Sequence, residues 1–264
     1  MRACALIPAF DAEATVARVV TAAVPLFADS GAVLVVDDGS RDATAAEARR
    51  AGAHVLVHER NRGKGAALRT GLREALARGF DVAVSIDADG QHPPVEGARL
   101  LAVDADPSAL VLGVRDLVAA GAPRANQISN GISNFFLSLF SRRALADTQC
   151  GLRRYPIAGT LALGGEDDGY AFEAEIILRA VAAGVRIVEE PVRVVYPPAG
   201  ERVSHFDSVR DPARIVARVV RTLVTRRSDA RAPLAGSGPQ PIARRERAST
   251  PVDGVATRPP PSAP

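Results

Sequence analysis

Tryptophan is absent from this sequence of 264 residues, and aromatic residues make up only 4% of it. Lys64 is the single lysine among 33 basic residues, which nearly balance 30 acidic residues and leave a net charge of +3. A nucleic-acid-binding protein needs a strongly basic face and usually aromatic side chains that stack on bases. The composition therefore argues against a nucleic-acid partner.

Cysteine is also scarce, since Cys4 and Cys150 are the only two and lie far apart in the sequence. They cannot form a disulfide framework, and no Cys/His cluster has zinc-binding spacing. No apolar stretch reaches the roughly 18 residues of a membrane span, and the N-terminal apolar run is too short for a signal peptide. We expect a cytoplasmic protein that is soluble or peripheral at the cytoplasmic membrane face.

Short apolar segments alternate with helical patterns along the chain. The strands are predicted at 4–7, 33–36, 54–58, 82–86 and 110–114, and at 185–195 with a break at Pro191. The helices are predicted at 16–27, 66–78, 127–140, 170–183 and 211–227. A further helix is predicted to begin at Ser40, its N-cap, and to end at Arg50. This alternation is typical of an open α/β fold with a mostly parallel sheet flanked by helices, whose ligands bind at the carboxyl ends of the strands.

The composition changes after residue 227. Eight of the 19 prolines fall in 228–264, which has almost no large apolar residues. Such a segment cannot bury enough apolar area to offset the entropy lost on ordering. The sequence thus predicts a single folded domain over 1–227 and a disordered tail over 228–264.

Acidic residues stand where two predicted strands end. Asp37 and Asp38 follow one strand, and Asp87 and Asp89 follow another, with the amide of Gln91 two residues further on. Oxygen ligands at this spacing suit a hard divalent cation such as Mg²⁺ or Mn²⁺, which commonly bridges to substrate phosphates. Such sequences also form simple turns and helix caps. Their occurrence at two strand ends favours a metal site formed by Asp87, Asp89 and Gln91.

Two glycines flank Lys64 before a predicted helix. Backbone N–H groups and one cation could hold an anion there, although a tight helix start packed on the sheet explains the glycines equally well. The segment is not a Walker A loop, because Gly65 stands where Ser or Thr should follow the lysine. No G-x-G-x-x-G follows the first strand, which argues against a dinucleotide-dependent dehydrogenase.

Four motifs occur together in order: PAFD at 8–11, VVDDGSRD at 35–42, NRGKGAAL at 61–68 and DADGQH at 87–92. With them the sequence resembles the family 2 glycosyltransferases of GT-A fold, in particular the dolichyl- and polyprenyl-phosphate mannose and glucose synthases. GVR at 113–115, DTQCGLR at 147–153 and FEAE at 172–175 extend the resemblance to about residues 3–225. It implies a nucleotide-sugar half at about 1–115 and an acceptor half at about 116–227.

The resemblance also implies roles for single residues. At the nucleotide sugar, Pro8, Phe10 and Val36 would line the base, and Asp38 would form a hydrogen bond with it. Lys64, Asp87 and Ala88 would also contact the nucleotide sugar. Asp89 and Gln91 would hold the metal on the diphosphate, while Arg115 and Arg153 would bind phosphate oxygens of acceptor or donor. One departure is Ala12, where relatives often carry Glu; here Glu13 follows it.

The acceptor separates two mechanisms. A hydroxyl acceptor must lose a proton to a nearby carboxylate. The candidate for this base is Asp168, in the acidic run 166–168. The alternative is that this run is only a solvated loop. A phosphate acceptor is already anionic and needs only cations. Arg115 and Arg153 favour the phosphate acceptor, and together with the resemblance this predicts an inverting, metal-dependent transfer of a hexose from a nucleoside diphosphate sugar to a polyprenyl phosphate. The alternatives are a hydroxyl of a saccharide, lipid or small molecule, and an inactive sugar-nucleotide-binding regulatory partner.

The predicted helix at 211–227 has an apolar face and a face of arginines. A basic amphipathic helix can lie in a bilayer surface, or its apolar face can pack on the sheet. The resemblance implies that the preceding loop, 196–210, is a lid with a cation on the donor diphosphate.

Overall fold

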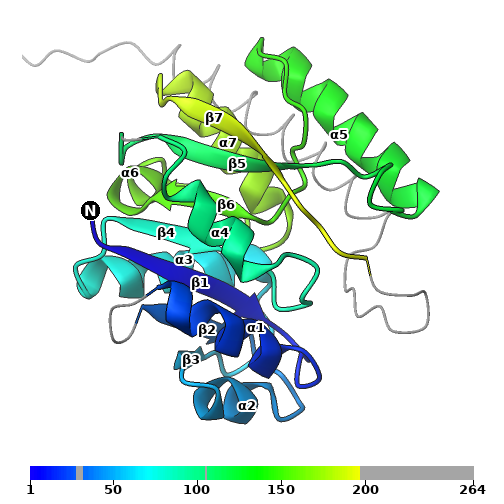
Figure 1. Ribbon diagram of the computed structural model, residues 1–264. Helices are drawn as coiled ribbons and strands as arrows, with labels where there is room; N and C mark the ends of the chain where they lie inside the picture. Colours follow the sequence, from blue (N-terminus) through cyan, green and yellow to red (C-terminus); the bar gives the residue numbers. More distant parts are fainter. Residues whose placement is uncertain (28–31, 105, 197–264) are drawn as a thin grey trace, which may run out of the picture.

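The computed structural model describes residues 1–27, 32–104 and 106–196. Their strands form one seven-stranded sheet in the order β3-β2-β1-β4-β6-β5-β7 (Figure 1). The strands are β1 (Ala3–Ala9), β2 (Val33–Asp37), β3 (His54–Val57), β4 (Val82–Ser85), β5 (Leu110–Arg115), β6 (Arg153–Pro156) and β7 (Ile187–Val192).

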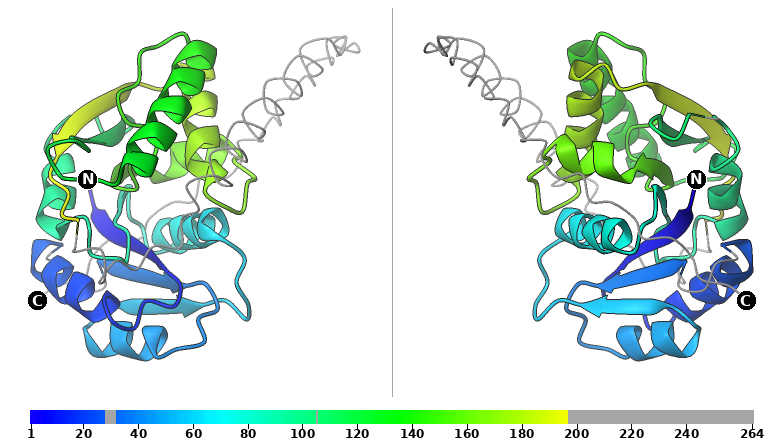
Figure 2. Two further views of the ribbon diagram at one scale, coloured as in Figure 1. Left: turned by 90° about the vertical axis from the view of Figure 1, so that its right-hand side faces the viewer. Right: turned by 90° about the vertical axis from the view of Figure 1, so that its left-hand side faces the viewer.

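Helices cover both faces of this sheet. They are α1 (Val16–Ala23), continued by the 3₁₀ turn η1 (Val24–Leu26), α2 (Thr44–Arg50), α3 (Lys64–Ala77), α4 (Pro94–Leu100), α5 (Arg124–Ser141), α6 (Ile157–Ala162) and α7 (Ala171–Ala182). The helix α3 packs on β1 and β2 and contacts α6 and α7, whereas α1 contacts α2 and α4 on the other face (Figures 1 and 2). The sheet is thus the middle layer of three.

The sheet is parallel except at one strand. β1 pairs in parallel with β2 and β4, and β5 with β7, while β6 runs antiparallel to both β4 and β5. Because β6 reverses direction between β4 and β5, those two strands still point the same way. The carboxyl ends of β1, β2, β4 and β5 therefore lie at one edge of the sheet.

Most of the elements predicted from apolar patterns are confirmed, but three short ones were not predicted. β6 has the sequence Arg153-Arg154-Tyr155-Pro156 and shows no strand pattern, because two arginines occupy fully buried positions. Arg154 reaches inward to donate to the carbonyls of Asp104 and Asp106 at 2.8 Å each. The other two elements, α4 and α6, have only 7 and 6 residues, too few to show a clear helical period.

Two local predictions are wrong. Ser40 does not cap α2, which begins at Thr44; instead its backbone N–H and its hydroxyl both donate to Asp37 Oδ1. Pro191 does not interrupt β7, which continues through it to Val192. This proline is tolerated because β7 is an edge strand, where the missing N–H removes no bond on the outer side.

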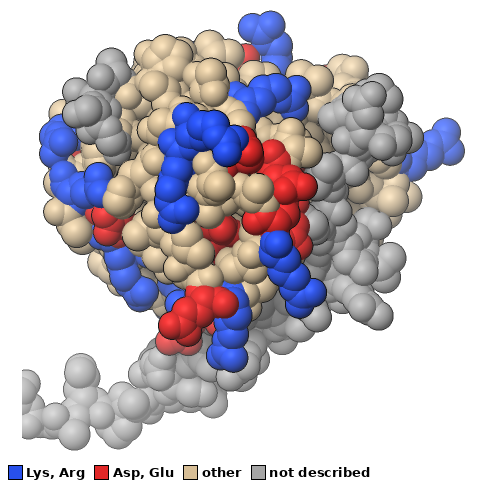
Figure 3. Space-filling view, turned by 90° about the horizontal axis from the view of Figure 1, so that it is seen from below, with Lys and Arg blue, Asp and Glu red and all other residues tan. Residues whose placement is uncertain are grey.

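The predicted helix at 211–227, most of the loop at 196–210 and the tail at 228–264 lie outside the described residues. Within the described ranges, no helix is both long and apolar enough to cross a membrane. On the face seen in Figure 3, the described basic and acidic side chains are interspersed and form no continuous basic surface.

Candidate active site

Three strands deliver polar side chains to the same edge of the sheet. Asp37 ends β2, Asp87 and Asp89 follow β4, and Arg115 ends β5. Since these strands share one direction, their carboxyl ends meet where ligands bind in open α/β sheets. The expectation that the two acidic pairs mark the functional edge agrees with this arrangement.

Lys64, the first residue of α3, forms an ion pair with the acidic loop after β4. Its ammonium nitrogen lies 2.7 Å from Asp87 Oδ1 and 3.2 Å from Glu173 Oε2 of α7. Its side chain is 14% exposed, so both pairs lie largely out of water. Glu173 belongs to the motif at 172–175, yet the sequence alone gave no sign that it would contact Lys64.

The charges around Lys64 set the protonation of the loop. Burial, the largest single effect, would raise the pKa of Asp87, but Lys64 and the other nearby cationic groups, Arg115 among them, together hold the pKa below its ordinary value. Burial would likewise lower the pKa of Lys64, and the two carboxylates instead raise it. Burial and the neighbouring charge of Asp87 raise the pKa of Asp89 to about 6. Asp89 is thus a carboxylate that a positive charge would stabilise.

The loop offers oxygen donor atoms of the kind that a hard divalent cation prefers. Asp89 Oδ1 accepts a hydrogen bond from the backbone N–H of Gln91 at 2.9 Å, which fixes the turn. In the described part of the chain, no three His, Cys, Asp or Glu side chains gather to hold a metal. Two carboxylates with one amide match an ion that completes its coordination with substrate phosphates and water.

A glycine makes room for the Asp87 carboxylate. A Cβ atom on Gly151 would overlap both carboxylate oxygens of Asp87. The backbone of Gly151 is fixed by the Ser85 hydroxyl of β4, which donates to its carbonyl at 2.6 Å. The segment before β6 therefore forms one wall of the acidic loop.

Asp38 is placed differently from the base contact that the resemblance implied. Its carboxylate accepts the backbone N–H groups of Arg62 and Gly63, the latter at 2.6 Å, and lies 2.6 Å from Nδ1 of His58. His58 in turn lies 3.0 Å from the hydroxyl of Thr70. Both oxygens of Asp38 are thus engaged in anchoring the segment that leads into α3, a role that sequence reasoning missed.

The other residues assigned to the nucleotide lie near the ends of β1, β2 and β4. Pro8, Val36 and Ala88 are buried, and Phe10 is half-buried. Behind Phe10, Asp11 Oδ1 accepts the backbone N–H of Arg41 at 2.9 Å and so joins the loops after β1 and β2. The structure therefore brings these residues to one edge of the sheet.

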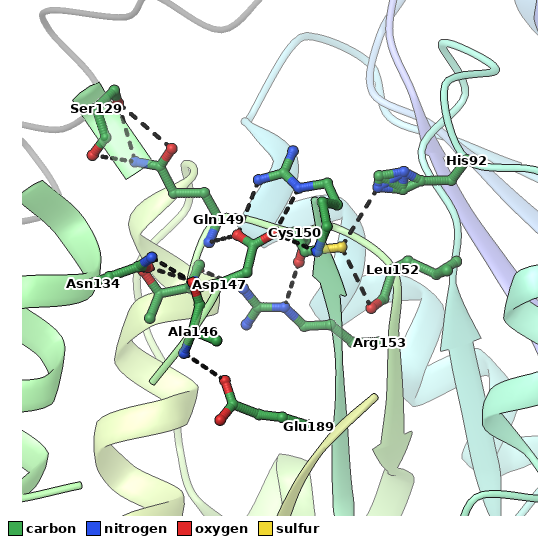
Figure 4. A network of polar contacts seen from close by, with 12 residues as sticks. His92, Ser129, Asn134, Ala146, Asp147, Gln149, Cys150, Leu152, Arg153 and Glu189 are labelled. Carbon is green, nitrogen blue, oxygen red and sulfur yellow. Dashed lines mark hydrogen bonds and ion pairs between the residues drawn. The ribbon is translucent and has the colours of Figure 1, made fainter. Parts of the chain in front are cut away.

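Arg115 is held in place by a carboxylate that the sequence did not single out. Its Nε and Nη2 donate to the two oxygens of Asp147 at 2.7 and 3.0 Å (Figure 4). Burial would lower the pKa of Arg115, but these hydrogen bonds raise it further above its already high value. Asp147 is the first residue of the motif at 147–153. The pair presents a permanently charged and oriented guanidinium.

An open groove of about 580 Å³ begins beside Arg115 and runs toward α5. Its lining includes Arg115 and Asp116 at the end of β5, and three amide side chains of α5: Gln127, Asn130 and Asn134. Asn130 is 5% exposed, and its Oδ1 has no hydrogen-bond partner among the described residues. The groove thus brings together one strongly basic group, one carboxylate and neutral polar groups.

Arg153 does not contact this groove, which corrects the phosphate-binding role implied for it. It is fully buried and donates to the backbone carbonyls of Thr148, Cys150 and Glu173 at 2.8–2.9 Å; Figure 4 shows Arg153 beside Cys150. Its guanidinium is therefore used to support the turn before β6.

Asp168 lies beside the start of α3. Its side chain is 60% exposed and pairs with Arg69, while its carbonyl accepts the backbone N–H of Ala66 at 3.1 Å. Gly63 and Gly65 permit this approach, since a Cβ on either would overlap the backbone of the acidic run. The paired carboxylate offers no support for a general base here.

His92 and Cys150 meet beside the acidic loop although 58 residues separate them. The ring Nε2 and the thiol Sγ are 3.5 Å apart (Figure 4). Burial lowers the pKa of His92 to about 4 and raises the pKa of Cys150 to about 12. Both groups are thus neutral packing partners, as expected for a buried thiol.

The sequence matches the family model described as glycosyl transferase family 2 over residues 4–156. The fold and the match together show that this chain belongs to the family 2 glycosyltransferases. It is 34% identical over 182 residues to undecaprenyl-phosphate mannosyltransferase of Micrococcus luteus, covering 64% of this chain and 74% of that protein. It is 35% identical over 178 residues to polyprenol monophosphomannose synthase of Mycolicibacterium smegmatis, covering 61% and 65%.

A solved structure shares the fold. Glucosyl-3-phosphoglycerate synthase of Mycobacterium tuberculosis, solved with Mn²⁺, uridine diphosphate and phosphoglyceric acid, superposes with a TM-score of 0.63. The two sequences are 20% identical, and the match covers 85% of this chain and 78% of the synthase. The chain therefore has the GT-A-type fold expected from its motifs and is a glycosyltransferase.

Proposed function

We propose that this protein transfers a hexose, with inversion, from a nucleoside diphosphate sugar to a polyprenyl phosphate in a metal-dependent reaction. The observation that carries the proposal is the placement of the Asp87/Asp89 loop and the Asp147-oriented Arg115 at one edge of the sheet. The loop supplies carboxylates for the side that binds the sugar donor, and Arg115 supplies a cation for the side that binds the acceptor.

The donor side consists of the loops after β1, β2 and β4. Asp87, Asp89 and Gln91 would hold Mg²⁺ or Mn²⁺, which would neutralise the charge that develops on the departing diphosphate. The Mn²⁺ and uridine diphosphate named for the mycobacterial synthase support this assignment. Lys64 keeps Asp87 ionised and fixes its side chain. Pro8, Phe10, Val36 and Ala88 provide the apolar surroundings for the nucleoside.

The acceptor side is the groove beside Arg115. A guanidinium whose orientation is fixed by Asp147 can hold a phosphate bidentately, and a phosphate nucleophile needs no general base. The two named bacterial relatives, whose names refer to undecaprenyl phosphate and polyprenol monophosphomannose, support a lipid phosphate as acceptor. An acceptor of this kind would place the protein peripherally at the cytoplasmic membrane face.

One observation favours the hydroxyl acceptor instead. Asp116 lines the same groove and is exposed, although its Oδ1 accepts the backbone N–H of Ala119 at 2.9 Å. A carboxylate at this place could take the proton of a hydroxyl acceptor.

An acceptor comparison tests the proposal. Purified protein is given Mn²⁺, a panel of nucleoside diphosphate hexoses, and either a polyprenyl phosphate or the matching polyprenol. We expect transfer only to the phosphate, with the configuration of the sugar inverted and with Asp116→Asn fully active. Transfer to the polyprenol that Asp116→Asn abolishes would establish the hydroxyl alternative. Tight donor binding without turnover on any acceptor would favour the inactive regulatory partner.

A further inference from the structure

The helix α5 exposes a continuous apolar stripe to solvent. Ile128 and Phe135 are each 64% exposed, Ile132 is 45% exposed and Leu139 is 59% exposed. These residues follow one another at intervals of four, three and four, so they lie along one side of the helix. Isolated exposed apolar residues are normal on protein surfaces, but an aligned set of this size is typical of an interaction surface.

Basic residues stand at both ends of this stripe. Arg124 begins α5, and Arg142 and Arg143 follow its last residue, all three exposed. The 18 residues of the helix include no Asp or Glu. An apolar stripe between arginines, without carboxylates, complements a surface that is apolar and negatively charged.

The opposite side of α5 is fixed to the rest of the protein. The hydroxyl of Ser133 lies 2.8 Å from that of Thr148, and Asn134 Oδ1 accepts the backbone N–H of Thr148 at 2.8 Å. Gln127 and Asn130 line the groove that begins at Arg115. The residues that line the groove and the residues of the apolar stripe therefore lie on different sides of α5, a helix at the edge of the molecule (Figure 1).

We propose that the stripe of Ile128, Ile132, Phe135 and Leu139 binds the surface of an anionic lipid bilayer, with α5 lying in the plane of the interface. An amphipathic helix binds a membrane in this way through buried apolar side chains and flanking cations. The helix lies on the membrane and does not cross it, in keeping with the lack of a spanning helix among the described residues. This inference rests on the proposed function, because binding of α5 to a membrane would bring the groove beside Arg115 to a lipid-borne acceptor.

A single fluorophore tests the contact directly. Because the chain has no tryptophan, Phe135→Trp creates the only one, and Leu76→Trp on α3, where Leu76 is 45% exposed, creates a matched control. Each full-length variant is mixed with phosphatidylcholine vesicles that contain or lack phosphatidylglycerol, and no polyprenyl phosphate. We expect a blue shift and quenching by brominated acyl chains only for Phe135→Trp, and only with phosphatidylglycerol present.

A second pair of variants measures the strength of the contact. Replacing Ile132 and Phe135 by Ser should weaken sedimentation with anionic vesicles about tenfold or more, because two apolar side chains no longer enter the interface. Replacing the exposed Leu76 and Val95 by Ser should leave binding unchanged, and thermal melting verifies that all variants are folded.

Three outcomes would overturn the inference: no vesicle binding, equal loss in both double variants, or a blue shift of Phe135→Trp that grows with protein concentration without vesicles. The last would assign the stripe to a second copy of this chain. Since these vesicles contain no acceptor, the result is independent of the transfer assay, which tests the proposed function.

Discussion

Lys64 and Asp87 form the pair that joins the start of α3 to the acidic loop after β4, with the ammonium nitrogen 2.7 Å from Asp87 Oδ1. Glu173 approaches the same ammonium at 3.2 Å from the opposite helix, α7. One cation is therefore shared between a carboxylate of the loop and a carboxylate behind it. This sharing leaves part of the negative charge of Asp87 available to a ligand.

Glu173→Gln tests this arrangement. Removing the second carboxylate concentrates the attraction of Lys64 on Asp87 and makes the loop less negative. We expect the Mn²⁺ concentration for half-maximal rate to rise about threefold to tenfold, with a smaller change in the rate at saturating Mn²⁺. Glu47→Gln, at a surface pair with Arg50, is the control. A lower melting temperature with an unchanged Mn²⁺ requirement would mean that Glu173 is only structural.

Gly151→Ala tests the wall of the acidic loop. The added Cβ would overlap the Asp87 carboxylate and force it away from its place beside Lys64. We expect kcat to fall about tenfold or more while the protein stays folded, as judged by circular dichroism. In Gly159→Ala the nearest atom to the new Cβ is 3.8 Å away, so activity should be unchanged. Full activity of Gly151→Ala would show that Asp87 need not occupy this position.

Arg115→Lys tests the acceptor side. Lysine keeps the charge but loses both the bidentate contact with Asp147 and the planar group that would face the phosphate. We expect KM for the polyprenyl phosphate to rise about tenfold, and KM for the donor to stay within twofold. If only the donor KM rises, this arginine binds the diphosphate of the sugar nucleotide.

Arg153→Met is expected to act on stability instead. The buried carbonyls of Thr148 and Cys150 would lose the donor that Arg153 supplies, and the helical carbonyl of Glu173 would lose its additional donor, which should lower the free energy of unfolding by about 3 kcal/mol or more. Urea denaturation followed by circular dichroism measures this loss. A stable variant with a raised acceptor KM would restore the phosphate-binding role that the sequence suggested.

Arg115 and Arg153 show which properties of a site residue can be predicted from the sequence. Both stand in recognisable motifs, and strand periodicity correctly placed Arg115 at the end of β5. Arg153 could not be assigned, because its position follows from β6, an antiparallel strand with no apolar pattern. Motif position predicts which residues gather at the edge of the sheet, whereas burial depends on the neighbours that the fold supplies.

The same limit applies to partners distant in sequence. The acidic loop was evident from Asp87 and Asp89, since both follow a clear strand. The contact of Glu173 with Lys64 depends on how α7 packs against α3, which no local pattern encodes. Asp38 shows the reverse case, because its motif suggested a ligand contact while its carboxylate serves the backbone of 62–63.

The dependence of transfer on Mn²⁺ in Asp89→Asn tests the central claim most directly. Initial rates of hexose transfer from the nucleoside diphosphate sugar to polyprenyl phosphate are measured against Mn²⁺ for the wild type, Asp89→Asn and the exposed control Asp81→Asn. The variant keeps the size of the side chain and one oxygen but loses the charge that attracts a hard cation. We expect Asp89→Asn to be folded, but to transfer hexose about a hundredfold or more slowly and without saturation by Mn²⁺. The Asp81→Asn control should match the wild type. A wild-type rate with wild-type Mn²⁺ dependence in Asp89→Asn would contradict the central claim.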